Sequence, residues 1–266
     1  MLVARSFVEY TVRCERGNIR ATNQDNFWCA GRYLESENDG LAAPLQGSAA
    51  SGSVPVFAVF DGMGGEKYGE VAAYLAAKAL DSRCQRRPRG DLERFMSALC
   101  DEMNTAVCSH SAAHHISRMG TTAALLAFTG KEYCLGNIGD SKIFLYNNGN
   151  LTQLSRDHVA AVAAGRKPPL TQCLGVPPRE FVIAPYIAQG KHADGDRYLL
   201  CSDGLTDMVA EEEIGETLAR HKDSRGCADA LVDRALAKGG VDNITVVLCD
   251  VHKKSKHGIR KGWWQI

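Results

Sequence analysis

The stretch Val56-Phe57-Ala58-Val59-Phe60-Asp61-Gly62 is typical of a buried strand that ends in a carboxylate. The same pattern recurs at Tyr198-Leu199-Leu200-Cys201-Ser202, which precedes Asp203-Gly204, and Asp242 stands just before the apolar run Ile244–Leu248. A carboxylate at the mouth of a buried strand is costly to desolvate unless a cation or hydrogen bonds receive it. Three such carboxylates would repel one another if they met, so we expect them to bind a divalent metal ion.

The order of apolar patterns around this stretch favours an α+β fold. Strands are expected at residues 6–14, 26–30, 54–60, 121–128, 133–137, 142–146, 151–154, 180–187, 198–202 and 244–251. Helices are expected at residues 68–83, 91–109, 211–221 and 225–238. Because the helices come in two pairs that strands separate and flank, a layered sandwich fits better than a doubly wound βαβ sheet.

Composition narrows the functional classes. The chain has 31 basic and 31 acidic residues in 266, and this zero net charge does not favour nucleic acid as a partner. We find no secretion signal at the N-terminus and no apolar stretch of membrane-spanning length. The ten cysteines include no C-x-x-C pair, which disfavours a disulfide framework or a zinc ribbon. We therefore interpret the chain as a cytoplasmic protein with reduced thiols.

The glycine-rich segment Asp61-Gly62-Met63-Gly64-Gly65 has two interpretations. Alone, it is equally typical of a strand-to-helix turn that needs glycines for positive φ. Together with the other two aspartates and with Gly136-Asn137-Ile138-Gly139-Asp140-Ser141, it indicates a site. The backbone carbonyl beside Asp61 is an oxygen that Mg²⁺ or Mn²⁺ accepts, and the absence of clustered His and Cys argues against zinc.

At this point the ordered motifs resemble those of the type-2C metal-dependent Ser/Thr protein phosphatases, in their compact bacterial form. The resemblance spans about residues 5–251 and implies a four-layer α/β/β/α sandwich of two antiparallel sheets. Eight motifs in family order are specific evidence for it. In chain order they are Arg20-Ala21-Thr22-Asn23-Gln24-Asp25, Val59–Gly65, Met119-Gly120-Thr121-Thr122, Gly136–Lys142, Leu154–His158, Leu170–Gly175, Leu200–Asp207 and Asp242–Val247.

The resemblance also implies the metal ligands. Asp61 would bridge two Mn²⁺ or Mg²⁺ ions, and the carbonyl of Gly62 would complete one coordination shell. Asp203 and Asp242 would bind the other ion, while Asp25 would act through metal-bound water. Asp140, together with Asp203, matches the site of a third, weaker ion.

Two further residues complete the implied machinery. Arg20 matches the arginine that holds the substrate phosphate, although a solvated surface arginine is the alternative. Asp207 would orient the loop that carries Asp203. A hydroxide shared by the two ions would attack phosphorus directly, so no phosphoenzyme is expected. Met63 stands where some members have a histidine, so the leaving alkoxide would take its proton from metal-bound water.

The chain also departs from the family pattern. Bacterial members usually carry a flap of some tens of residues where only Val159–Pro169 separates His158 from Leu170 here. The segment Gly31–Ser53 is an addition that we interpret as a long exposed loop, and its composition favours disorder. The basic tail, residues 253–266, contains two tryptophans, and we expect a solvated tail there rather than a membrane contact.

From these observations we expect one catalytic domain, residues 1–252, that hydrolyses phosphoserine and phosphothreonine in proteins. The expected partners are phosphorylated proteins, including a Ser/Thr kinase, and we expect a monomer that binds neither nucleic acid nor membrane. The main alternative is a scaffold or binding protein that kept the fold and lost catalysis. A phosphatase for a small molecule or nucleotide is a third possibility, because it would use the same chemistry.

Overall fold

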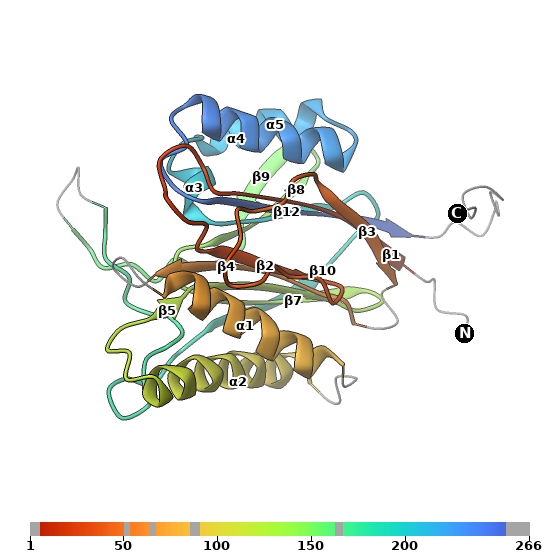
Figure 1. Cartoon of the computed structure of the whole chain (residues 1–266). Coiled ribbons are helices and arrows are strands. Elements are labelled where there is room, and N and C mark those ends of the chain that lie inside the picture. Colours follow the sequence, from red (N-terminus) through yellow and green to blue (C-terminus); the bar gives the residue numbers. More distant parts are fainter. Residues whose placement is uncertain (1–5, 51–53, 64–67, 86–90, 163–166, 254–266) are drawn as a thin grey trace, which may run out of the picture.

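Two antiparallel sheets form the centre of the molecule, in a computed structural model that describes residues 6–50, 54–63, 68–85, 91–162 and 167–253 (Figure 1). The first sheet has the strand order β3 (Leu45–Ala50), β1 (Ser6–Glu15), β12 (Ile244–Lys253), β11 (Arg197–Cys201), β8 (Lys142–Asn147) and β9 (Asn150–Gln153). The second has the order β10 (Tyr186–Lys191), β7 (Glu132–Ile138), β6 (Ala123–Phe128), β4 (Val56–Met63) and β2 (Asp25–Cys29). The short β5 (Gly120–Thr121) pairs with the end of β4.

Helices cover the outer face of each sheet. The longer ones are α1 (Gly69–Cys84), α2 (Leu92–Ala113), α4 (Glu211–Arg220) and α5 (Ser224–Ala237). Figure 1 shows α1 and α2 on one outer face and α4 and α5 on the other. The expected four-layer sandwich is therefore confirmed, and so are both predicted helix pairs to within a few residues.

Burial on both faces explains the uninterrupted apolar strands. In β4, Phe57 and Val59 point between the sheets, while Val56, Ala58 and Phe60 pack under α1 and α2. A strand covered on both faces carries apolar residues at every position instead of alternating with polar ones. This burial changes at the end of β4, where Asp61 and Met63 are only partly buried.

Two expectations about local structure were wrong, and one short helix was not predicted. Part of the segment predicted as an exposed, disordered loop is strand β3, which pairs with β1 from Phe7↔Ala50 to Val12↔Leu45. Residues 51–53 of that segment lie outside the described residues. The strand predicted at residues 180–187 is displaced to β10, Tyr186–Lys191. The four-residue helix α3 (Asp203–Thr206) was not predicted, because a single helical turn has no periodicity to detect.

The described part of the chain ends with strand β12. Strand β12 runs through Lys253, one residue past the expected domain boundary, and residues 254–266 of the predicted tail lie outside the described residues. Within the described ranges, none of the helices combines the length and the apolar character needed to cross a bilayer.

Candidate metal centre

An acidic cavity of about 380 Å³ lies where the two sheets meet α3. Most of the predicted site residues line it, although they come from five separate parts of the sequence. The lining consists of Arg20, Gln24, Asp61, Gly62, Met63, Asp140, Lys167, Pro168, Leu170, Asp203 and Asp242. The structure therefore brings most of the predicted site residues to one cavity. Asp25 is the one predicted ligand that does not line it.

Asp61 is fixed by hydrogen bonds at the end of β4. Its backbone N–H donates to Oγ1 of Thr122 at 3.0 Å, and its carbonyl accepts the Thr122 N–H at 2.9 Å. The next residue is glycine for a steric reason: a Cβ on Gly62 would clash with the backbone of Gly69 and with the carbonyl of Gln24. The close approach of three chain segments thus holds Asp61 at the cavity wall.

Asp203 begins α3, two residues after Cys201, the last residue of the buried strand β11. Here again a glycine follows, and a Cβ on Gly204 would collide with the backbone carbonyl of Asn243. The missing side chain lets α3 lie directly against the segment that carries Asp242. Two aspartates 39 positions apart in the sequence therefore face the same cavity.

The geometry of a cation site is clearest for three of the carboxylates. One carboxylate oxygen each of Asp61, Asp140 and Asp203 lies within 4.8 Å of the others. Burial raises the pKa of Asp61, and the charges of Asp203, Asp25 and Asp140 raise it further. Burial and the charge of Asp203 likewise raise the pKa of Asp140 to about 6. Such mutual repulsion is relieved when a divalent cation binds, and oxygen donors suit Mg²⁺ or Mn²⁺.

Asp25 lies behind this triad on β2, where it pairs in register with Asp61 of β4. Its Oδ2 accepts hydrogen bonds from Ser202 Oγ and from Thr245 Oγ1, both at 2.7 Å. Burial raises the pKa of Asp25 to about 7 despite these two bonds, and the carboxylates of Asp203 and Asp242 add to the shift. Asp25 is therefore buried beside the cavity and is not among the residues that line it.

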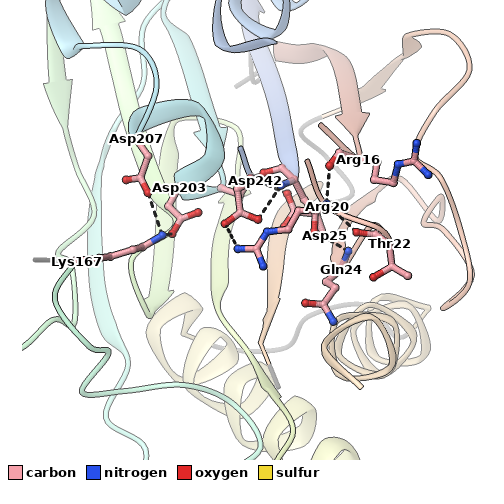
Figure 2. A network of polar contacts seen from close by, with 11 residues as sticks. Arg16, Arg20, Thr22, Gln24, Asp25, Lys167, Asp203, Asp207 and Asp242 are labelled. Carbon is pink, nitrogen blue, oxygen red and sulfur yellow. Dashed lines mark hydrogen bonds and ion pairs between the residues drawn. The ribbon is translucent and has the colours of Figure 1, made fainter. Parts of the chain in front are cut away.

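Asp242 lines the cavity but does not belong to the triad. Its Oδ2 accepts a hydrogen bond from Nη2 of Arg20 at 2.6 Å, and the Arg20 side chain is half exposed. Asn243 braces the segment that carries Arg20: its Nδ2 donates to the carbonyls of Arg16 and Thr22, and its Oδ1 accepts the N–H of Gln24. Figure 2 shows Arg20 directed at Asp242 from the side of this segment.

Sequence reasoning missed one charged residue of the cavity. Nζ of Lys167 donates to Oδ2 of Asp203 and, at 2.9 Å, to Oδ2 of Asp207. Figure 2 shows Lys167 reaching Asp203 from the side opposite to Arg20. A lysine in a short connecting segment has no sequence signal that distinguishes it from a solvated one. Asp207 was expected to orient the loop that carries Asp203, and the observed contact links the two through Lys167.

A second cavity of about 580 Å³ adjoins the first, since Met63 lines both. Its walls are largely apolar, with two arginines and a glutamate among them. The residues are Met63, Cys108, Ser111, Ala112, Ile116, Ser117, Arg118, Met119, Gly120, Cys173, Gly175, Val176, Pro177, Arg179 and Glu180. The acidic cavity therefore opens beside a larger hollow that can accommodate side chains.

Comparison with known proteins agrees with this geometry. The family model described as protein phosphatase 2C matches residues 44–238. The chain belongs to the protein phosphatase 2C family. This phosphatase 2C chain is 33% identical over 256 residues to the serine/threonine protein phosphatase PstP of Mycobacterium tuberculosis, covering 92% of this chain and 45% of that protein. It is 29% identical to the serine/threonine phosphatase stp of Listeria monocytogenes, covering 90% of this chain and 94% of that protein.

A solved structure resembles the whole phosphatase 2C fold described above. The crystal structure of the PstP catalytic domain in complex with two manganese ions superposes with a TM-score of 0.76 at 32% identity. The match covers 93% of this chain and all of that one. The chain spans less than half the length of the full-length PstP protein that it matches.

Proposed function

We propose that this chain is a metal-dependent protein serine/threonine phosphatase whose catalytic domain spans residues 1–252. The observation that carries the proposal is the convergence of Asp61, Asp203 and Asp242 on one cavity. Asp140 adds a fourth carboxylate there, and one oxygen each of Asp61, Asp140 and Asp203 lies within 4.8 Å of the others. Membership of the protein phosphatase 2C family and the likeness to PstP and stp support the substrate class. The scaffold alternative is not favoured, because clustered buried carboxylates cost stability that a scaffold has no reason to accept.

The metal ligands proposed are Asp61, the carbonyl of Gly62, Asp203 and Asp242, with Asp25 supporting them from behind. Two Mn²⁺ or Mg²⁺ ions are proposed for each chain, by analogy with the two manganese ions in the PstP structure. When bound, these ions supply the Lewis acidity that activates water and neutralises charge on a phosphoryl group. Ser202 and Thr245 keep Asp25 oriented, as residues behind a metal site commonly do.

Arg20 is the proposed phosphate-binding residue. Its guanidinium lies at the rim of the cavity, where the hydrogen bond to Asp242 raises its pKa and holds it beside the proposed ions. A planar guanidinium donates two parallel hydrogen bonds to phosphate oxygens, which fixes the phosphoryl group for in-line attack. The half-exposed side chain can turn from Asp242 to a substrate without leaving the cavity.

No side chain is proposed as a nucleophile or as a proton donor. Met63 lines the cavity where a protonated histidine would otherwise serve, and a thioether has no proton to give. Burial raises the pKa of the nearby thiols of Cys14 and Cys201 to about 12, so neither is a thiolate near neutral pH. We therefore propose direct transfer of the phosphoryl group to water.

The substrates proposed are phosphorylated proteins, including a Ser/Thr kinase of the same cell. The larger cavity beside Met63 supports this class, because it offers space for residues that flank a phosphoserine or phosphothreonine. A small-molecule phosphatase would need no such extension. We further propose that the chain acts as a cytoplasmic monomer.

The test is phosphate release from a phosphothreonine peptide, measured with and without Mn²⁺. Wild type and the exposed-site control Asp233→Asn should show the same Mn²⁺-dependent turnover, and Asp61→Asn should show almost none. Equal activity of the Asp61→Asn variant would contradict the proposed ligand. Turnover of p-nitrophenyl phosphate without any turnover of phosphopeptides would instead favour a small-molecule phosphatase.

A further inference from the structure

Lys167 is the one lysine that lines the acidic cavity as the structure describes it. Its ammonium contacts Oδ2 of Asp203, and the Asp203 carboxylate also belongs to the cluster formed with Asp61 and Asp140. It contacts Asp207 as well, at 2.9 Å, so it spans two carboxylates of α3 and its C-terminal flank. One oxygen of a proposed metal ligand is therefore already occupied by a side-chain cation.

This contact differs from an ordinary surface ion pair. The Asp203 side chain is only 11% exposed, whereas Lys167 is 55% exposed and reaches inward to meet it. Burial acts to lower the pKa of Lys167, but the contacts with the Asp203 and Asp207 carboxylates together outweigh burial and raise it. The same charge partly offsets the rise in the pKa of Asp140. Lys167 thus acts electrostatically on both Asp140 and Asp203.

The charges around the cavity balance when two divalent ions are present. Two side-chain cations, Arg20 and Lys167, contact the acidic group. That group has six carboxylates, namely Asp25, Asp61, Asp140, Asp203, Asp207 and Asp242. Two divalent ions and two side-chain cations neutralise six carboxylates, and a third divalent ion would leave an excess of positive charge. It would also repel the ammonium that already binds Asp203.

We propose that Lys167 serves as a fixed cation between Asp203 and Asp207, so that the centre binds two divalent ions and excludes a third at Asp140 and Asp203. This rests on the metal centre of the proposed function and makes Lys167 a positioning residue rather than a metal ligand. It replaces the third, weaker ion expected from the resemblance.

The experiment measures Mn²⁺ stoichiometry by titration calorimetry and by equilibrium dialysis, with no substrate present. Wild type should bind two ions per chain. Lys167→Met keeps the length of the side chain and removes its charge, so this variant should bind a third, weaker ion. Lys167→Met/Asp140→Asn should return to two ions. Lys238→Met is the matched control, because Lys238 pairs with Glu213 and neither residue lines the cavity, and this variant should also bind two ions.

Several results would overturn the proposal. Three ions in the wild type would do so, and so would two ions in a Lys167→Met variant whose urea unfolding is unchanged. Lys167→Arg retains a cation and should bind two ions, which tests the charge separately from any change in folding. Fewer than two ions in the wild type would overturn this proposal together with the proposed metal centre. Correct stoichiometries without phosphopeptide turnover would overturn the proposed activity alone.

Discussion

Strand β11 begins at Arg197 and leads into Asp203, and the two ends handle buried charge in opposite ways. The Arg197 guanidinium donates to both oxygens of Asp250, at 2.6 and 2.9 Å, and to the carbonyls of His221 and Lys222. At the other end, Asp203 faces further carboxylates, and the only protein cation described on it is Lys167. We call the Arg197 end, where the buried charges are paired, the matched end, and the Asp203 end, where carboxylates face one another, the unmatched end. The matched end stabilises the fold, whereas the carboxylates of the unmatched end repel one another until metal ions bind.

The largest effect is expected at the matched end. Arg197→Ala should lower the free energy of unfolding by about 3–5 kcal/mol, because it leaves Asp250 buried without its partner. Urea unfolding monitored by circular dichroism measures the change. Arg220→Ala, on the exposed end of α4, is the control and should change stability by less than about 0.5 kcal/mol. If Arg197→Ala lowered the free energy of unfolding as little as Arg220→Ala does, the two ends of β11 would not differ in this way.

At the unmatched end, a substitution should lower activity without lowering stability. Asp203→Asn should lower kcat/KM on a phosphopeptide by more than about 100-fold, or about 2.7 kcal/mol. Substitution of a residue that merely orients a metal ligand already lowers activity or metal affinity about 10- to 100-fold. Its metal-free form should unfold with a free energy equal to or above that of the wild type, because one repelling charge is gone. A variant that is inactive because it is unfolded would contradict this expectation.

Stabilisation by Mn²⁺ should also distinguish the two ends of β11. Mn²⁺ at ten times its Kd should raise the free energy of unfolding of the wild type by about 1.4 kcal/mol for each site filled. Arg197→Ala should gain as much, because the two ends of β11 are independent. Asp203→Asn should gain clearly less. Thermal unfolding with and without chelator measures these increments, and an equal gain in all three proteins would show that Mn²⁺ binds elsewhere.

The smallest effect concerns pH in the metal-free protein. The folded state raises the pKa of Asp25 to about 7, so folding favours the protonated form of this carboxyl. The resulting stability is fully present below the ordinary pKa near 3.8 and is lost as pH rises through about 7. Between pH 6 and 8 the loss should be on the order of 1 kcal/mol. Unfolding in chelator at several pH values tests this, and a rise in stability over that range would have the wrong sign.

Much of the fold was predictable, because its strands and helices carry strong periodic signals. The uninterrupted apolar runs of β4 and β12 reflect burial between a second sheet and a helix pair, and both elements were predicted. Strand β3 was missed because it is an edge strand with alternating exposure and small residues, which a sequence pattern does not distinguish from a loop. Its pairing with β1 depends on the tertiary fold and not on the local sequence.

Some residues of the candidate site were predictable from the sequence, and others were not. Asp61 and Asp203 were predictable because each follows a buried strand and precedes a glycine that close packing requires. Asp242 was placed in the right cavity, but its contact with Arg20 depends on the loop that Asn243 braces. Lys167 was missed, since its role comes only from the position of α3 relative to a short connecting segment.

The pairing of β1 with β12 has a consequence for how the chain matures on the ribosome. From Ser6↔Lys253 to Glu15↔Ile244, the first described strand aligns with the last, and β12 lies between β1 and β11. A nascent chain therefore has to keep β1 unpaired on that side until β12 emerges, which makes folding late and dominated by distant contacts. Asp242 emerges just before β12, so the acidic cavity can be complete only when the end of this sheet has been translated.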